Sequence, residues 1–234
     1  KKNSSKFSKE RFKKIMAIFK RNLTSKILEI TVAEVLLKKG RLKGRCLEVG
    51  CGDFNISSNL FKKFQSWSFS GSDISNESIG IAIKNDAKNI FDLRVGGLFE
   101  PWAGEKFDLI ISDVASISEI VASHSDWYKG VSCNTGLDGM LLIEKIITSA
   151  KDYLLDDGIF IIPYISLSDI DKQKKVLEGN FQNVEYVNEK DWPLDSHIVT
   201  QLQKWSQENG EKYWTLRKVL DLDVAFTGAA VAYC

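Results

Sequence analysis

From residue 45 to its C-terminal end the chain alternates between apolar runs and amphipathic segments, and no other sequence feature restricts the fold as much. Short apolar runs predict buried strands, and apolar residues spaced three and four apart predict helices. Strands are predicted at 45–50, 68–73, 90–95, 106–113, 158–165, 183–189 and 223–234, and helices at 56–64, 76–89, 136–154 and 167–180. Such alternation is typical of a parallel sheet with helices on both faces. We therefore expect an α/β fold with a Rossmann-like sheet.

The composition is that of a protein with a hydrophobic core. It is 44% hydrophobic and 27% charged, and no apolar run approaches the roughly 18 residues that a membrane span needs. The lysine-rich start lacks an initiator Met and is not followed by the apolar segment of a signal peptide, so we expect a processed or trimmed start. The cysteines form no C-x-x-C pair, which argues against a zinc site and fits a cytoplasmic location. They are Cys46, Cys51, Cys133 and Cys234.

The charge is distributed unevenly along the chain. Residues 1–45 hold 15 Lys or Arg and three acidic residues, whereas the remainder holds 17 Lys or Arg and 28 acidic residues. We expect a basic helical arm over residues 1–40 and a separate domain over 41–234. Helical spacing relates Phe12, Ile15, Met16, Phe19 and Leu23, and Thr24 or Ser25 can cap a second helix that carries Ile27, Leu28, Val35 and Leu36. Residues 1–23 are a candidate surface for nucleic acid or an acidic partner, unless they are only a solvated helix face.

The candidate ligand site lies after the first two strands, because such sheets bind ligands at the carboxyl ends of their strands. The first strand runs into "LEVGCGDFN" (47–55), where Gly50 and Gly52 allow a tight turn. Position 55 is Asn, where a dinucleotide fingerprint has a third glycine, and Glu48 precedes the first glycine by two residues. The second strand ends at Asp73, whose carboxylate can accept hydrogen bonds from both ribose hydroxyls of a nucleoside cofactor.

These motifs resemble those of known methyltransferases. The acid-x-Gly-x-Gly pattern resembles motif I of class I S-adenosylmethionine (SAM) methyltransferases. The stretches "SDISNESIGIA" (72–82), "GGLFEPWAGEKFDLIIS" (96–112) and "TGLDGMLLIEKIITSAKDYLLDDGIFII" (135–162) resemble the release-factor glutamine methyltransferase family. The resemblance implies a seven-stranded sheet with an antiparallel last strand, a SAM-binding methyltransferase domain over 41–234, and SAM as cofactor. It implies cofactor contacts from Glu48, Gly50, Cys51, Gly52, Asp73, Ile74, Gly97 and Leu98.

The sequence departs from that family at two positions. Gly97 replaces the aspartate that helps hold the adenine end, and Ser112-Asp113-Val114-Ala115 replaces Asn-Pro-Pro-Tyr after the fourth strand. Without that clamp for a planar nitrogen, we do not expect methylation of a glutamine amide. We expect Asp113 to face the transferable methyl and orient or deprotonate a hydroxyl or ammonium group, with Ser112 at the position of the asparagine. "SDVA" (112–115) also resembles ribose 2′-O methyltransferases, but their lysine on the next strand is missing at 161–163. A helix-capping role for Asp113 is the structural alternative.

Aromatic and histidine residues in predicted loops are further candidates. The aromatic side chains could stack on a flat substrate, form a lid or pack together. Either histidine could be a base or a surface residue without a role. No cluster of metal ligands is evident. The residues are Trp127, Tyr128, His124 and His197, with Trp205, Tyr213 and Trp214 in an insertion at about 194–222.

Three functions agree with the sequence. The first is SAM-dependent transfer of a methyl group to an O or N nucleophile of a small molecule or side chain. The second is methylation of RNA or a ribosomal protein that the basic arm recruits. The third is a non-catalytic homologue that binds SAM. The sequence names neither the acceptor nor the oligomeric state.

Overall fold

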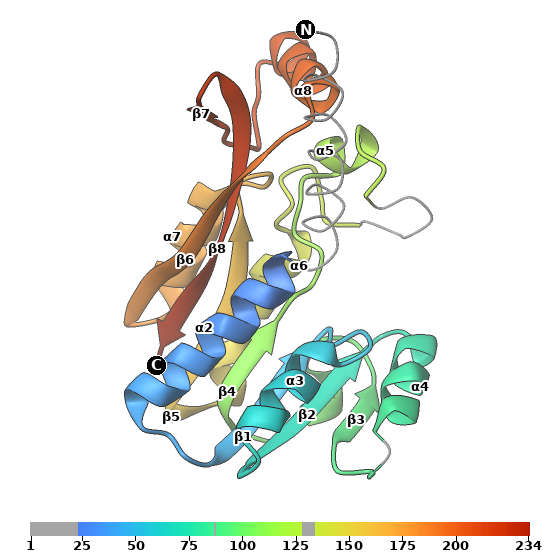
Figure 1. Cartoon of the computed structure of the whole chain (residues 1–234), viewed down its shortest axis with the longest axis vertical. Coiled ribbons are helices and arrows are strands. Elements are labelled where there is room, and N and C mark those ends of the chain that lie inside the picture. The colour runs from blue at the N-terminus through green and yellow to red at the C-terminus, as the bar shows by residue number, and fades with distance from the viewer. Residues whose placement is uncertain (1–22, 87, 128–133) are drawn as a thin grey trace, which may run out of the picture.

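The computed structural model describes residues 23–86, 88–127 and 134–234. One sheet with helices on both faces dominates them (Figure 1). Its order is β3-β2-β1-β4-β5-β8-β6, and β7 pairs with β8 beside this path. The strands are β1 (Gly44–Val49), β2 (Trp67–Asp73), β3 (Asp92–Val95), β4 (Phe107–Ser112), β5 (Leu154–Ile165), β6 (Asn183–Pro193), β7 (Arg217–Val219) and β8 (Leu222–Tyr233).

The predicted α/β class is confirmed, with eight strands in place of seven. The first five strands along the path pair in parallel, and β8 runs antiparallel to both β5 and β6, as the resemblance implied. The additional strand is β7, which has only three residues and forms a hairpin with β8. Such a short, exposed strand leaves little periodic signal in the sequence.

Helices from different parts of the chain cover the two faces of the sheet. Those of the described residues are α2 (Leu23–Lys39), α3 (Asn55–Lys63), α4 (Asn76–Asn85), α5 (Glu119–Ser123), α6 (Leu141–Ala150), α7 (Ile170–Asn180) and α8 (Ser196–Asn209), with 3₁₀ turns at Glu100–Trp102 and Lys151–Tyr153. None of these helices is long and apolar enough to cross a bilayer.

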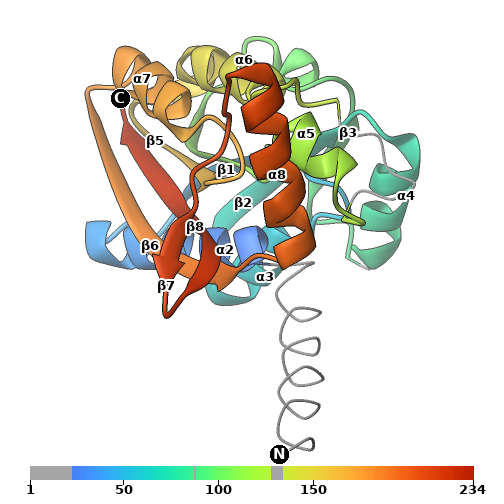
Figure 2. The same ribbon diagram turned by 90° about the horizontal axis from the view of Figure 1, so that it is seen from above.

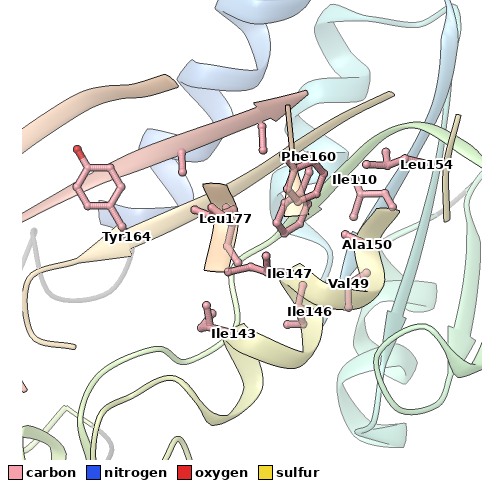
Figure 3. Packing of buried hydrophobic residues seen from close by; sticks show 14 of the residues in the cluster. Val49, Ile110, Ile143, Ile146, Ile147, Ala150, Leu154, Phe160, Tyr164 and Leu177 are labelled. Carbon is pink, nitrogen blue, oxygen red and sulfur yellow. The ribbon is translucent and has the colours of Figure 1, made fainter. Parts of the chain in front are cut away.

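Alternating side chains of the central strands supply two separate cores. On one face, Ile110 and Phe160 pack with Ile146 of α6 and Leu177 of α7 (Figure 3). On the other face, the neighbouring Leu109 packs into a cluster that includes Leu28 and Val32 of α2 and Leu60 of α3. Successive residues of a strand point to opposite faces, so one apolar run can serve both cores.

Helix α2 packs against the sheet as part of the second core. Ile27, Leu28 and Leu36 are buried, as their spacing predicts. The prediction that Thr24 or Ser25 caps this helix is wrong, because both residues already lie within it. The first predicted helix and most of the candidate nucleic-acid surface fall on residues 1–22, outside the described part of the chain.

The predicted helix at 136–154 is shorter in the structure. Gly136 and Gly139 have positive φ angles of 82° and 76°, which form a turn, and α6 begins only at Leu141. A Cβ atom at Gly139 would lie 2.8 Å from the carbonyl carbon of Ile117, so this turn approaches the backbone after β4 closely. These glycines therefore keep residues 136–140 out of the helix.

The aromatic insertion at 194–222 is ordered structure, not a set of open loops. It contains α8 and β7, and α8 lies beside α5 (Figure 2). Of the proposed aromatic roles, packing is the one observed. Trp214 is buried in a third cluster, Trp205 lies 5.6 Å from it between ring centroids, and Trp127 lies 5.7 Å from Trp192. Tyr128 lies outside the described residues.

Candidate functional site

A cavity of about 890 Å³ lies at the carboxyl ends of β1 and β4. This is the switch point of the sheet, since the chain leaves β1 toward β2 on one side and returns to β4 on the other. Helices α2 and α3 form one wall, and the loop after β1 forms another. The lining residues are Leu23, Ser25, Lys26, Glu29, Glu48, Gly50, Cys51, Gly52, Asp53, Asn55, Ile56, Asn59 and Asp113.

The two glycines of the loop after β1 have different surroundings. Both adopt positive φ, 67° at Gly50 and 53° at Gly52. A Cβ atom at Gly50 would lie 2.3 Å from Cγ1 of Val114, whereas one at Gly52 would meet no atom within 4 Å. Gly50 therefore lets this loop pack against the segment after β4, and Gly52 leaves open space beside the cavity. Between them, Cys51 donates its backbone N–H to the carbonyl of Ser72 at 2.9 Å, and burial raises the pKa of its thiol.

Glu48 connects β1 to α3 from inside the protein. Its side chain is 2% exposed, and its Oε2 accepts a hydrogen bond from the backbone N–H of Ser57 at 3.0 Å. Ser57 belongs to the first turn of α3, whose own cap position, Phe54, provides no side-chain hydrogen bond. Burial raises the pKa of Glu48 to about 8, although the contact with Ser57 lowers it. Glu48 therefore supplies the missing cap and is largely protonated at neutral pH.

Asp73 holds the same loop from the end of β2. Its Oδ2 accepts the backbone N–H of Gly52 at 2.9 Å, and its Oδ1 accepts that of Ser75 at 2.8 Å. Asp73 itself does not line the cavity. Each carboxylate oxygen has two acceptor sites, so these contacts leave capacity for ribose hydroxyls. The predicted ribose contact stays a prediction.

The remaining predicted cofactor residues lie near Asp73, outside the cavity. Ile74 is 80% exposed. The carbonyl of Leu98 accepts a hydrogen bond from the Ser72 hydroxyl at 2.8 Å, and the N–H of Gly97 donates to Oε2 of Glu100 at 3.2 Å. A carboxylate thus lies beside the position where the resembling family has an aspartate.

The two residues predicted to act on the acceptor have separate environments. Ser112 is fully buried, its hydroxyl donates to the carbonyl of Val49 at 2.9 Å, and it does not line the cavity. Asp113 does line it, and its Oδ2 accepts a hydrogen bond from the hydroxyl of Ser25. Burial raises the pKa of Asp113 to about 6, and hydrogen bonds from Ser25 and Thr24 lower it. Of these two residues, only Asp113 lines the cavity.

The sequence alone does not indicate the contribution of α2 to this site. Ser25 and Asp113 are 88 residues apart in the chain, and no periodic pattern connects them. The candidate bases His124 and His197 belong to the α5 and α8 region and do not line the cavity. The described residues contain no group of three or more side chains that could hold a metal ion.

Comparison with known proteins adds independent findings. A family model described as a methyltransferase domain matches residues 42–217. The chain is 26% identical over 129 residues to the ribosomal protein uL3 glutamine methyltransferase of Xanthomonas campestris, covering 52% of this chain and 42% of that protein. It is 29% identical over 140 residues to the release factor glutamine methyltransferase of Bacillus subtilis, covering 55% and 46%. The chain thus spans less than half the length of these curated relatives.

Solved structures share the fold at low sequence identity. The ribosomal protein L11 methylase of Lactobacillus delbrueckii superposes with a TM-score of 0.54 at 16% identity, covering 91% of this chain and 80% of that one. The 16S rRNA N2 G1207 methyltransferase of T. thermophilus, solved with AdoMet and guanosine, superposes with a TM-score of 0.52 at 13% identity, covering 88% and 42%.

Proposed function

Because the chain belongs to the methyltransferase-domain family, we propose that it transfers the methyl group of SAM to an O or N nucleophile of a small polar molecule or side chain. The observation that carries this proposal is the position of Asp113, a half-buried residue that lines the same cavity as Glu48 and the glycine loop at the switch point of the sheet. SAM supplies an electrophilic methyl group on a sulfonium.

The residues around the cavity fit SAM, the cofactor of this family. We assign its amino acid end to the side of the cavity formed by Glu48 and the glycine loop, where Gly52 leaves space that a side chain would fill. We assign the ribose to Asp73 and the adenine to the exposed Ile74, whose apolar surface a flat ring would cover. We also assign Gly97 and Leu98 to the adenine end, because they lie beside the end of β2 that carries Asp73.

The polar and charged side chains that line the cavity favour a polar acceptor. Among the described residues its apolar side chains are Leu23, Cys51 and Ile56, and no aromatic ring lines it. The aromatic residues of the insertion pack in their own cluster instead. A flat base would lack a stacking partner among these residues, whereas an ammonium or hydroxyl group can bind to a carboxylate.

Asp113 is the residue that we assign to the acceptor. A carboxylate with a pKa near 6 is mostly charged at neutral pH, so it can orient an ammonium or accept the proton of a nucleophile. Holding the nucleophile against the methyl carbon is the main requirement of such a displacement. The relatives named for glutamine methylation do not determine the acceptor here, because the Asn-Pro-Pro-Tyr clamp is absent from this sequence.

A second candidate function is methylation of RNA or a ribosomal protein. The strongly basic N-terminal residues support it, since such segments bind nucleic acid through its phosphates. A third candidate is a homologue that binds SAM without turnover, which the loss of the clamp supports. The two experiments below separate these candidates.

The cofactor assignment is tested with Asp73→Ala. We expect it to weaken SAM binding by about 2–3 kcal/mol, because charge-assisted hydrogen bonds to the ribose and the anchor on Gly52 are lost together. Isothermal titration calorimetry with SAM measures the change. Asp92→Ala is the control, since this exposed carboxylate lies at the start of β3 and pairs with Arg94. Unchanged affinity in Asp73→Ala, or binding of NAD in place of SAM, would contradict the assignment.

The acceptor assignment is tested with Asp113→Asn. Mass spectrometry of the purified protein for bound SAM or its demethylated product comes first, followed by a screen of amines, hydroxyl compounds and RNA. We expect Asp113→Asn to reduce turnover by about 10²–10⁴ with SAM affinity nearly intact. Normal turnover would return Asp113 to a structural role. SAM binding without turnover on any acceptor would favour the non-catalytic homologue.

A further inference from the structure

The wall that α2 adds to the cavity comes from outside the matched methyltransferase domain. The family match begins at residue 42, whereas Leu23, Ser25, Lys26 and Glu29 all belong to α2. Leu28 and Val32, three and seven residues after Ser25 and so on the same side of the helix, are buried in the core against the sheet. The N-terminal end of α2 is therefore held at the cavity by the apolar packing of the turns that follow it.

Ser25 makes an unusual hydrogen bond for a helical serine. Serine hydroxyls inside helices commonly bond to a backbone carbonyl of the preceding turn. The hydroxyl of Ser25 donates instead to Oδ2 of Asp113, 88 residues later in the chain. Both side chains are partly buried and line the same cavity. This contact joins a helix outside the matched domain to the one carboxylate that the strand end of β4 presents to the site.

We propose that Ser25 is a positioning residue, whose hydroxyl fixes Oδ2 of Asp113 so that the second carboxylate oxygen stays directed to the acceptor side of the cavity. With Thr24 as its neighbour in the same contact, it makes α2 the element that sets the geometry of acceptor binding. The assignment of the acceptor side rests on the proposed function, whereas the control of Asp113 by Ser25 does not.

The titratable groups around Asp113 explain why a hydroxyl is a suitable hydrogen-bond donor to its carboxylate. Glu48 of β1, Asp53 of the following loop, and Lys26 and Glu29 of α2 share the cavity with it. Glu29 is paired with Lys63 at 3.1 Å. A lysine in place of Ser25 would neutralise Asp113 and compete with a cationic acceptor, whereas a hydroxyl orients the carboxylate and leaves its charge available.

The experiment follows the titration of the Asp113 carboxyl group directly. Full-length protein is labelled with ¹³C at aspartate carboxyl carbons, the Asp113 signal is identified by its loss in Asp113→Asn, and NMR spectra are recorded from pH 4 to pH 9. Ser25→Thr and Ser25→Val are the matched pair, because they have nearly the same shape and differ in the hydroxyl. Thr200→Ala is the control, since it removes a helical hydroxyl of α8 that bonds only within its own helix.

Loss of the hydroxyl should favour the protonated form of Asp113. In Ser25→Val the midpoint of its titration should move up by about one pH unit, a tenfold change in proton affinity, because a hydrogen bond to the charged form is lost. Ser25→Thr and Thr200→Ala should titrate like the unmodified protein. Ser25→Ala repeats the test if valine prevents folding. A midpoint in Ser25→Val or Ser25→Ala equal to that of the unmodified protein would overturn the proposal.

SAM calorimetry on the same proteins distinguishes the two proposals. If the unmodified protein fails to bind SAM while the titration responds to Ser25, the proposed function fails and the positioning role stands. If SAM binds and the titration does not respond, the positioning role fails and the proposed function stands. We expect SAM affinity in Ser25→Val within about twofold of that of the unmodified protein, because Ser25 contacts the carboxylate assigned to the acceptor.

Discussion

At the scale of single residues, the burial of Glu48 combines a structural and a site role in one carboxyl group. The strand places it inside the sheet, where it caps α3 through the N–H of Ser57, and it also lines the cavity. Burial raises its pKa because an ionised carboxylate is poorly solvated there. The protonated form therefore keeps the interior neutral while its carbonyl oxygen still accepts the hydrogen bond.

This burial makes stability depend on pH in a defined direction. The folded protein keeps the proton of Glu48 up to about pH 8, whereas the unfolded chain releases it near its ordinary value of 4.5. The free energy of unfolding should therefore fall as pH rises from about 4.5 to 8, by roughly 4 kcal/mol for this group. Glu48→Gln keeps an acceptor for Ser57 and should lose this dependence. Urea denaturation at pH 5, 7 and 9 measures it.

The control for this experiment is Glu77→Gln, which alters an exposed carboxylate in the first turn of α4. That variant should retain the pH dependence of the unmodified protein. Parallel pH curves for the unmodified protein and Glu48→Gln would show that Glu48 is not the group responsible.

At the scale of elements, the two glycines of the loop between β1 and α3 have different surroundings, since one is packed and the other borders the cavity. Gly50 touches the segment after β4 through Val114, and Gly52 opens toward the cavity. Both need the positive φ that glycine adopts without strain. Glycine is thus needed at position 50 because Val114 packs against it, and at position 52 because a side chain there would fill space beside the cavity.

Alanine substitutions should separate these two roles. Gly50→Ala should destabilise the protein by about 2–5 kcal/mol, because steric overlap with Val114 adds to backbone strain. Adding Val114→Ala should restore the part of the stability that is lost through steric overlap with Val114. Gly52→Ala should cost only about 1–2 kcal/mol and yet weaken SAM binding at least tenfold. Thermal unfolding and calorimetry measure both effects; equal destabilisation, with equal SAM affinity, would refute the division.

At the scale of the whole molecule, a basic N-terminal segment precedes an acidic remainder. Helix α2 carries the end of the basic part into the core of the sheet domain, where its N-terminal residues reach the cavity. The structure describes none of residues 1–22, so their role stays a prediction of the sequence.

Binding of RNA by this segment should be strongly salt-dependent. If residues 1–23 recruit RNA, the logarithm of the binding constant should fall with the logarithm of salt concentration, by about 0.7 per phosphate neutralised on a single strand. Gel shifts with a single-stranded oligonucleotide measure the slope. Glutamine at Lys13, Lys14, Lys20 and Arg21 should reduce it. Absence of binding at low salt would leave this segment a structural or protein-docking element.

The sequence by itself determined the alternation of strands and helices and the place of the glycine loop. Leu109 and Ile110 alternate between two cores because a strand has period two, and this period can be read locally. The tertiary structure alone decided what covers each face. The packing of α8 against α5 and the hydrogen bond from Ser25 to Asp113 join residues that are distant in the sequence, whereas β7 is too short and exposed to leave a local signal. Local periodicity specifies which side of an element is buried, whereas contacts between distant side chains depend on how the elements assemble.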